Sequence, residues 1–491
     1  MKRKLIYILV AFVMSGVFSS CKRELLNAAP ENTISDASAF STQARISNQV
    51  LSLYSALKNG AFYGGRYIVY GDIRGEDFLL EDPNLVTNAD VWALNPTNTA
   101  NAIVGLWAQA YLVINNCNVF IDGMNEKGLA VVGNTIGTNY IAEARLIRAI
   151  SYYSLLQYYA GPYANGNGSK PGLPLRLVGI KGAGFSDLAR STVSEVYSQI
   201  ISDLDFAEAN LPTNNAASAS SAANLNRAHK NTAIAFKTRV YLSMQNYAKV
   251  IEEANKLVPA SAPFTAKSGV AHTLLSDYTT VFKTYNNAES ILSLPFTTST
   301  GDIPGTQNGL QGYYYAASTG LGSIFSLNPS GIIGNTGWTA TDKRRTFIFT
   351  AISGSNVGKI YLTKFPTAAP ADNSIVIRWA EVLMNLAEAR VRSTNTIDAQ
   401  AVALLNAIRN RSDATTTFTV GSFTTAGNLL SAVMTERRIE FLGEGLRNND
   451  LMRLLQSLPA KGTVIAKAPS EEGYIWPVSA AEKSLNKLWV D

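Results

Sequence analysis

The chain has 491 residues and a formal charge of +6, and it is 46% hydrophobic but only 16% charged, below the roughly 25% typical of soluble domains. Lys2, Arg3 and Lys4 lie in a segment that we expect to be removed, and subtracting them from the 42 basic residues leaves 39 against 36 acidic ones. So small an excess does not favour a nucleic-acid partner.

The first residues have the features of an exported lipoprotein. An apolar run at residues 5–18, too short to span a bilayer, is followed by Ser19, Ser20 and Cys21. We therefore expect a signal peptide at residues 1–20, a lipid on Cys21 and a lipid-anchored tether at residues 21–36. With Cys21 acylated, Cys117 would have no partner for an intramolecular disulfide. The alternative is a plain signal peptide and a chance cysteine.

Residues 37–258 have the apolar spacing of helices. The stretch YIAEARLIRAISYYSLLQYYAGPY, residues 140–163, is apolar around most of its girth, which predicts a buried helix. Thr192, with Glu195 three residues later, predicts a capping box at the start of another helix. Successive helix pairs of this length are typical of tetratricopeptide-type arrays. The other predicted helices of this part lie at residues 37–57, 100–124, 227–244 and 247–258, and residues 60–71 and 71–96 read as loops.

The helical pattern fades between residues 259 and 374, where Gly, Thr, Ser and Asn accumulate. We expect an irregular insertion here, with short strands at residues 290–296 and 358–365. A second helical part, residues 375–491, follows, with helices at residues 375–391, 397–409 and 429–442 and a closing loop whose Trp476 packs back on the body. The tetrapeptide AEAR at residues 142–145 returns at residues 387–390, which suggests two similar helical units.

Most common catalytic motifs are missing from the sequence. Its two histidines, His229 and His272, lie near no nucleophile signature, and there is no GxSxG, HExxH, P-loop or GxGxxG. The acidic residues at 72–82 match the spacing of no calcium loop. Glu440 and Glu444, one helical turn apart, could in principle serve a glycosidase, but arginines surround them and an ion-pair network is the stronger interpretation.

Large aromatic residues in polar loops favour carbohydrate instead. The CH face of a pyranose ring stacks on a flat aromatic ring, while neighbouring amides and charged groups bind its hydroxyls. The competing interpretation is that such aromatics simply pack in the core. Two tryptophans lie in polar loops with an amide three residues away: Trp92 with Asn95, and Trp338 with Asn335. The candidate ligand-binding residues are Trp92, Asn95, Trp338, Asn335, Asp72, Arg74, Tyr63, Tyr313 and Tyr314.

Several segments in this order resemble the SusD/RagB family of outer-membrane nutrient-binding lipoproteins. They are the leader with its cysteine, AEARLIRAISYYSLLQYYAGPY, RSTVSEVYSQIISDLDFAEANLP, ESILSLPF, IRWAEVLMNLAEARV, LNAIRNRS, ERRIEFLGEGLRNNDLMRL and WPVSAAEKSLN. The resemblance implies a mainly α, tetratricopeptide-like scaffold with an irregular insertion. It also implies a non-enzymatic protein that captures glycans for a TonB-dependent, SusC-like barrel transporter. From the residues themselves we expect neither a cofactor nor a metal.

That function would place the protein on the outer membrane, facing the cell exterior. Lys22 and Arg23 follow the cysteine, at the position where surface-exposed members carry an acidic cluster. The sequence therefore does not decide between the inner and the outer leaflet of the outer membrane. Two alternatives to a glycan-binding lipoprotein also stay open. One is a surface glycosidase that uses carboxylates, and the other is a tetratricopeptide-like module that binds peptide.

Overall fold

The computed structural model describes residues 36–490 apart from 183, 185, 300, 306, 316–323 and 366–371. The predicted signal peptide, Cys21 and nearly all of the predicted tether lie outside the described residues. The longer helices are α3 (Gln43–Leu57), α6 (Asn101–Gly123), α8 (Asn134–Tyr159), α9 (Val193–Asn210), α11 (Lys230–Ser243), α12 (Tyr247–Leu257), α14 (Trp379–Thr394), α15 (Ala399–Ser412) and α16 (Ala426–Glu440). Shorter helices are α2 (Asp36–Ala39), α4 (Arg66–Ile73), α5 (Ala89–Trp92), α7 (Leu129–Val132), α10 (Ala222–Leu225), α13 (Leu310–Tyr314), α17 (Arg447–Arg453) and α18 (Ala480–Leu485).

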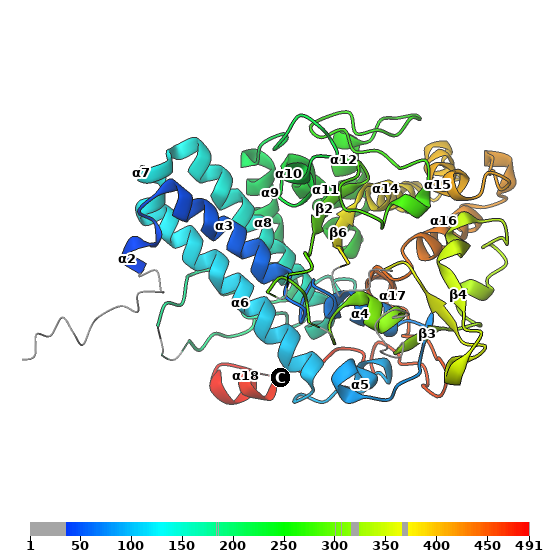
Figure 1. The fold of residues 1–491 in the computed structure, drawn as a ribbon, viewed down its shortest axis with the longest axis horizontal. Helices are drawn as coiled ribbons and strands as arrows, with labels where there is room; N and C mark the ends of the chain where they lie inside the picture. Colours follow the sequence, from blue (N-terminus) through cyan, green and yellow to red (C-terminus); the bar gives the residue numbers. More distant parts are fainter. Residues whose placement is uncertain are drawn as a thin grey trace, which may run out of the picture.

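The long helices pack in succession, and each covers the apolar face of the next. Helices α3, α6 and α8 run side by side, α8 packs on α9, α9 on α11, and α11 on α12 (Figure 1). The series continues through α12 on α14, and α14 on α15 and α16. This arrangement confirms the predicted mainly helical scaffold of paired helices.

Helix α8 is the central element, as its all-round apolarity predicts. Between Ile141 and Tyr159 only Arg145 is not fully buried. The helix ends at Tyr159, just before Gly161 and Pro162. The predicted capping box at the start of α9 is also confirmed, since the Thr192 hydroxyl accepts a hydrogen bond from the Glu195 amide and the Glu195 carboxylate accepts one from the Thr192 amide.

The described residues form three two-stranded antiparallel sheets. They pair β1 (Phe78–Leu80) with β3 (Phe325–Leu327), β2 (Ser290–Leu294) with β6 (Ser374–Arg378), and β4 (Ile348–Thr350) with β5 (Ile360–Leu362). The helix predicted at residues 375–391 is therefore wrong at its start. Residues 375–378 extend because they hydrogen-bond to β2, more than 80 residues earlier in the chain, and the helix begins only at Trp379.

The loop predicted at residues 60–71 is also partly wrong, because α4 begins at Arg66. All residues from Tyr67 to Ile73 are buried, so this helix is fixed by packing rather than by an amphipathic pattern. Gly71 allows close contact with the turn after α16: a Cβ atom at this position would lie 1.9 Å from the Gly445 carbonyl oxygen.

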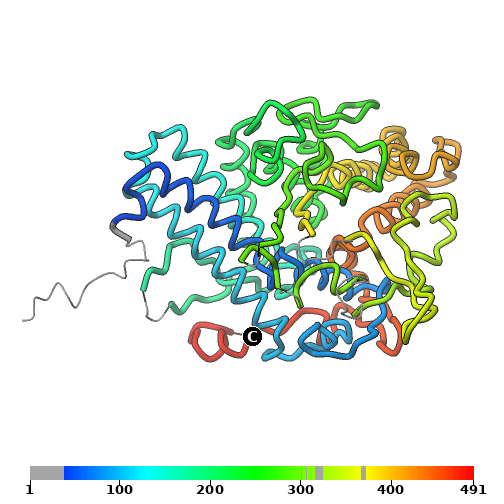
Figure 2. Tube along the Cα trace, in the orientation of Figure 1, coloured from blue at the N-terminus to red at the C-terminus, as the bar shows by residue number. Residues whose placement is uncertain are grey.

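The C-terminal segment returns to the body and lies along the residues that precede α6 (Figure 2). The Trp476 amide donates to the Tyr158 carbonyl at 2.7 Å, and the Trp476 and Tyr158 rings are 4.5 Å apart. This contact confirms that Trp476 packs against the scaffold. Within the described ranges, none of the helices combines the length and apolarity needed to cross a bilayer.

Candidate functional site

Trp92, the first predicted stacking residue, is buried at 8% exposure. Its indole N–H donates to the Phe78 carbonyl at 2.8 Å, and the Lys461 ammonium lies 5.6 Å from its ring centre. Gly462 packs against the ring edge. The expectation of an exposed platform is thus corrected: Lys461 and Gly462, about 370 positions later in the chain, cover the ring.

Trp338, the second predicted stacking residue, is buried at 3% exposure. The guanidinium of Arg345 lies 4.8 Å from the centre of its ring and donates to the Trp338 carbonyl at 2.5 Å. Arg345 thus lies over the ring, and the 3% exposure shows that the protein covers the rest of it. The expectation of an exposed ring is corrected here as well.

The predicted tyrosines and Asp72 belong to the core. The Tyr314 hydroxyl donates to Asp72 at 2.6 Å, and the Gly445 amide donates to the same carboxyl oxygen at 3.0 Å. Burial raises the pKa of Asp72 to about 8 despite these donors. Tyr63 is buried against Ser154, 3.1 Å away, and Tyr313 donates to the Gln307 carbonyl at 2.7 Å. These side chains are buried and hydrogen-bond within the fold.

Arg74 is also fully buried and fastens the C-terminal segment. It donates to the carbonyls of Gly473 at 3.2 Å and Tyr474 at 2.5 Å. Its guanidinium lies 5.7 Å from the ring centres of both Tyr158 and Trp476. Burial lowers the pKa of Arg74 to about 10. Its role in the structure is therefore to join distant segments.

Two of the nine candidates, Asn95 and Asn335, are exposed. Of the two, Asn335 lines an open cavity of about 480 Å³, and Asn95 is not among the residues that line it. We call this the α16–α17 cavity. The residues that line it are Ile332, Asn335, Arg392, Leu430, Ser431, Met434, Thr435, Arg438, Arg447, Leu454 and Gln456.

Helix α16 forms one wall of this cavity from residues one turn apart. Leu430, Met434 and Arg438 repeat every four residues, and Ser431 and Thr435 lie beside them on the same face. Arg447 of α17 and, after that helix, Leu454 and Gln456 also line the cavity. The chain reverses between the two helices at Gly443 and Gly445, which have φ values of 85° and 76°. In the sequence Arg438 and Arg447 stand close to Glu440 and Glu444, which predicts ion pairs, and no local pattern indicates the cavity that they line.

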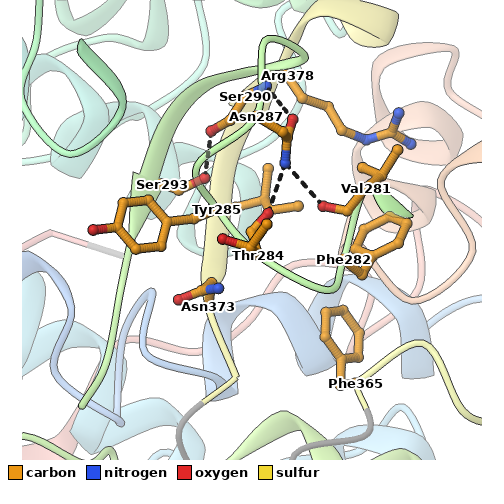
Figure 3. A pocket seen from close by; sticks show the side chains of 11 residues that line it. Val281, Phe282, Thr284, Tyr285, Asn287, Ser290, Ser293, Phe365, Asn373 and Arg378 are labelled. Carbon is orange, nitrogen blue, oxygen red and sulfur yellow. Dashed lines mark hydrogen bonds between the residues drawn. The ribbon is translucent and has the colours of Figure 1, made fainter. Parts of the chain in front are cut away.

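A second cavity, at the β2–β6 sheet, is too small for a sugar. Its volume is about 10 Å³, enough for roughly one water molecule. The Asn287 amide donates to the carbonyls of Val281 and Thr284 at 3.1 and 2.7 Å, and the Ser290 and Ser293 hydroxyls are 2.7 Å apart. Dashed lines mark these contacts in Figure 3. The polar groups of this cavity thus bind one another.

The carboxylates of the glycosidase alternative lie in a buried ion-pair network. Glu440 accepts from Arg378 at 2.6 Å, from Arg344 at 2.9 Å and also from Arg411. Burial by itself would raise the pKa of Glu440, but the guanidiniums of Arg411, Arg378 and Arg344 outweigh it and hold that pKa well below the usual range. Glu444 binds Arg378 at 2.7 Å. Glu440 is buried, the Glu444 side chain is only 7% exposed, and both carboxylates are paired with cations, which accounts for them structurally.

The repeated AEAR segments also supply buried ion pairs. Glu143 binds the Arg227 guanidinium at 2.5 and 3.1 Å, and Glu388 binds Arg453 at 2.6 and 2.7 Å. The matching glutamates therefore join their helices to later segments of the chain.

Comparisons with known proteins agree with this architecture. A family model described as "Starch-binding associating with outer membrane" matches residues 25–242, and the "SusD family" model matches residues 350–488. The chain is 26% identical to SusD-like protein P25 of Formosa agariphila over 59% of this chain and 51% of that protein. It is 23% identical to SusD-like protein P2 of the same organism, over 87% of each.

A solved structure shows the same likeness over nearly the whole length. The crystal structure of a SusD superfamily protein from Bacteroides fragilis is 30% identical, with a TM-score of 0.80, and the match covers 92% of this chain and all of that one. Two family models, related sequences and this structure agree on one assignment. The chain belongs to the SusD family.

Proposed function

We propose that this protein is a glycan-binding lipoprotein of the outer membrane. In this proposal a lipid on Cys21 anchors it to the cell exterior, and it captures oligosaccharide for a TonB-dependent, SusC-like barrel transporter. The family description as starch-binding and outer-membrane associated supports the ligand class and the location. The observation that carries the proposal is the α16–α17 cavity, which opens a polar volume of about 480 Å³ on a SusD-type scaffold.

The cavity has the size and the chemistry that an oligosaccharide requires. Its volume lies within the roughly 300–1,000 Å³ of ordinary ligand sites. The amides of Asn335 and Gln456 and the hydroxyls of Ser431 and Thr435 offer donors and acceptors to sugar hydroxyls. Leu430, Met434 and Leu454 offer apolar surface for the CH face of a pyranose. Binding would thus rely on side chains that the structure leaves accessible, not on the two buried tryptophans.

Calorimetry of the lipid-free chain against a broad glycan panel tests this proposal. We expect saturable binding that Gln456→Ala and Asn335→Ala each weaken severalfold. Asn286→Ala, in an exposed loop, is the matched control and should bind as the parent does. If Asn95→Ala abolishes binding while both cavity variants bind normally, the glycan sits elsewhere. No binding across the panel would remove the sugar ligand from the proposal.

Two further measurements separate the alternatives. Release of sugar products by the parent chain, lost in a Glu440→Gln variant that still folds, would favour a glycosidase. For the transporter, the protein should co-purify from solubilised outer membranes with a TonB-dependent barrel encoded beside it. Co-purification together with peptide binding, and without glycan binding, would instead favour the peptide-binding module.

A further inference from the structure

Three arginines line the α16–α17 cavity, and carboxylates behind them fix two of these side chains in place. Arg438 donates to Asp77 at 2.8 and 2.5 Å and lies 2.9 Å from Glu76. Arg447 donates to the same Glu76 at 3.0 and 2.6 Å. Both guanidiniums donate through their Nε and Nη2 atoms. Neighbouring carboxylates therefore fix the Nε–Nη2 edge of each guanidinium.

The third arginine, Arg392, is held at the end of α14. Its Nε donates to Glu388 at 2.6 Å, and its guanidinium lies 5.8 Å from the Tyr247 ring centre. Glu388 is fully buried and also binds Arg453, so it does not reach the cavity. The three arginine side chains that line the cavity are 19–20% exposed.

Each guanidinium keeps N–H donors that no described residue accepts. The Nη1 atoms of Arg438 and Arg447, and both Nη atoms of Arg392, make no hydrogen bond within the described part of the chain. Among the described residues that line the cavity, none is Asp or Glu. The wall therefore presents fixed cationic donors, with the compensating carboxylates placed behind them.

Because arginines line the cavity and their carboxylate partners do not, the electrostatic potential inside it is positive. Cations in the wall lie nearer to a bound group than the carboxylates behind them, so their attraction for an anion exceeds the repulsion. The remaining Nη N–H groups of these guanidiniums can each donate to an oxygen of a carboxylate or a sulfate, and such charge-assisted hydrogen bonds are stronger than those between neutral groups. Because Glu76 and Asp77 already fix the side chains of Arg438 and Arg447, little side-chain entropy is lost when a ligand binds.

We infer that the α16–α17 cavity binds an anionic oligosaccharide, one whose sugars carry carboxylate or sulfate groups. The inference rests on the proposed glycan-binding function and narrows its ligand class. The anionic group lies against Arg392, Arg438 and Arg447, while the amides and hydroxyls of the same cavity contact the sugar hydroxyls. Neutral oligosaccharides lack the group that these donors require and bind more weakly.

Position 431 allows a test that leaves the arginines and the fold untouched. Ser431 is exposed on α16, and Glu and Gln are both good helix formers. Ser431→Glu adds a carboxylate inside the cavity, whereas Ser431→Gln adds a side chain of the same size without charge. A second pair compares two arginines. Arg392→Gln removes a cation that lines the cavity, whereas the control Arg45→Gln removes an exposed cation on α3, which does not line it.

The probes are three oligosaccharides of similar length: an oligogalacturonate, a sulfated galactan fragment and a neutral malto-oligosaccharide. We expect the lipid-free chain to bind at least one acidic probe more tightly than the neutral one, and more weakly in 0.5 M salt. Ser431→Glu should lower that affinity by about tenfold or more, and Arg392→Gln by several fold. Arg45→Gln should change it by less than about twofold, and Ser431→Gln, which adds no charge, should lower it clearly less than Ser431→Glu does. The two acidic probes distinguish carboxylate from sulfate recognition.

Failure of this inference is distinguishable from failure of the proposed function. Tight binding of the neutral probe with no preference for the acidic ones overturns the inference and keeps glycan binding. No binding of any probe overturns both. Binding of an acidic probe that is equal in Ser431→Glu and Ser431→Gln overturns the assignment to this cavity.

Discussion

Substitution of Glu440 by Gln tests whether the buried network is structural. Gln keeps the shape of Glu440 but removes the charge that Arg344, Arg378 and Arg411 share, and it turns an NH₂ donor toward guanidinium donors. Glu440 is 0% exposed, so water cannot replace the lost acceptor. Breaking a buried ion pair from one side costs about 3–5 kcal/mol, because the remaining charge stays buried without its partner.

The expected shift follows from the size of the chain. An unfolding entropy of about 2.1 cal/mol/K per residue gives roughly 1 kcal/mol/K for 491 residues, so we expect Glu440→Gln to melt about 3–5 °C below the parent. Differential scanning calorimetry at pH 7 measures this. Glu252→Gln is the control, because its pair with Lys249 is exposed and worth less than about 1 kcal/mol.

The same variant carries a prediction on pH. The folded-state pKa of Glu440 lies below its value in the unfolded chain, about 4.3. The stability that this carboxylate contributes is therefore fully present above about pH 4.3 and is lost as the pH falls below it. In a plot of melting temperature against pH, Glu440→Gln should therefore show a smaller fall below about pH 4.3 than the parent does. A variant as stable as the parent both at pH 7 and below pH 4.3 would refute the structural role of the network.

Three further outcomes are expected. His272 is buried, and burial lowers its pKa to about 4. Its neutral form therefore contributes stability that is fully present above about pH 6.5 and is lost as the pH falls toward 4. His272→Gln should reduce the fall in melting temperature between pH 7 and pH 5, and an unchanged fall would contradict this. Burial raises the pKa of the Cys117 thiol, so a thiol-specific reagent should leave it unmodified in the native lipid-free chain and react after denaturation; rapid native reaction would argue against its burial. Gly71→Ala places a methyl group against the Gly445 carbonyl and should cost about 2 kcal/mol or more in chemical denaturation, whereas equal stability would show that the turn after α16 can move.

The local patterns of the sequence predict the scaffold well. The apolar girth of residues 140–163 requires burial in any fold, and α8 is buried over most of its length. The capping box of Thr192 and Glu195 depends on residues three positions apart, so it needs no tertiary information. The arginines around Glu440 likewise indicate an ion-pair network from composition alone, although their individual partners do not follow from it.

What the sequence by itself determined is the helical scaffold, because periodicity and capping are set by neighbours in the chain. Tertiary structure alone decided the fate of the candidate ligand residues. Trp92 and Trp338 lie in polar segments, yet Lys461 and Arg345 lie over their rings. Residues 375–378 form a strand only because β2 offers backbone partners. The α16–α17 cavity combines side chains from residues 332 to 456, and burial and cavity walls depend on contacts between such distant residues.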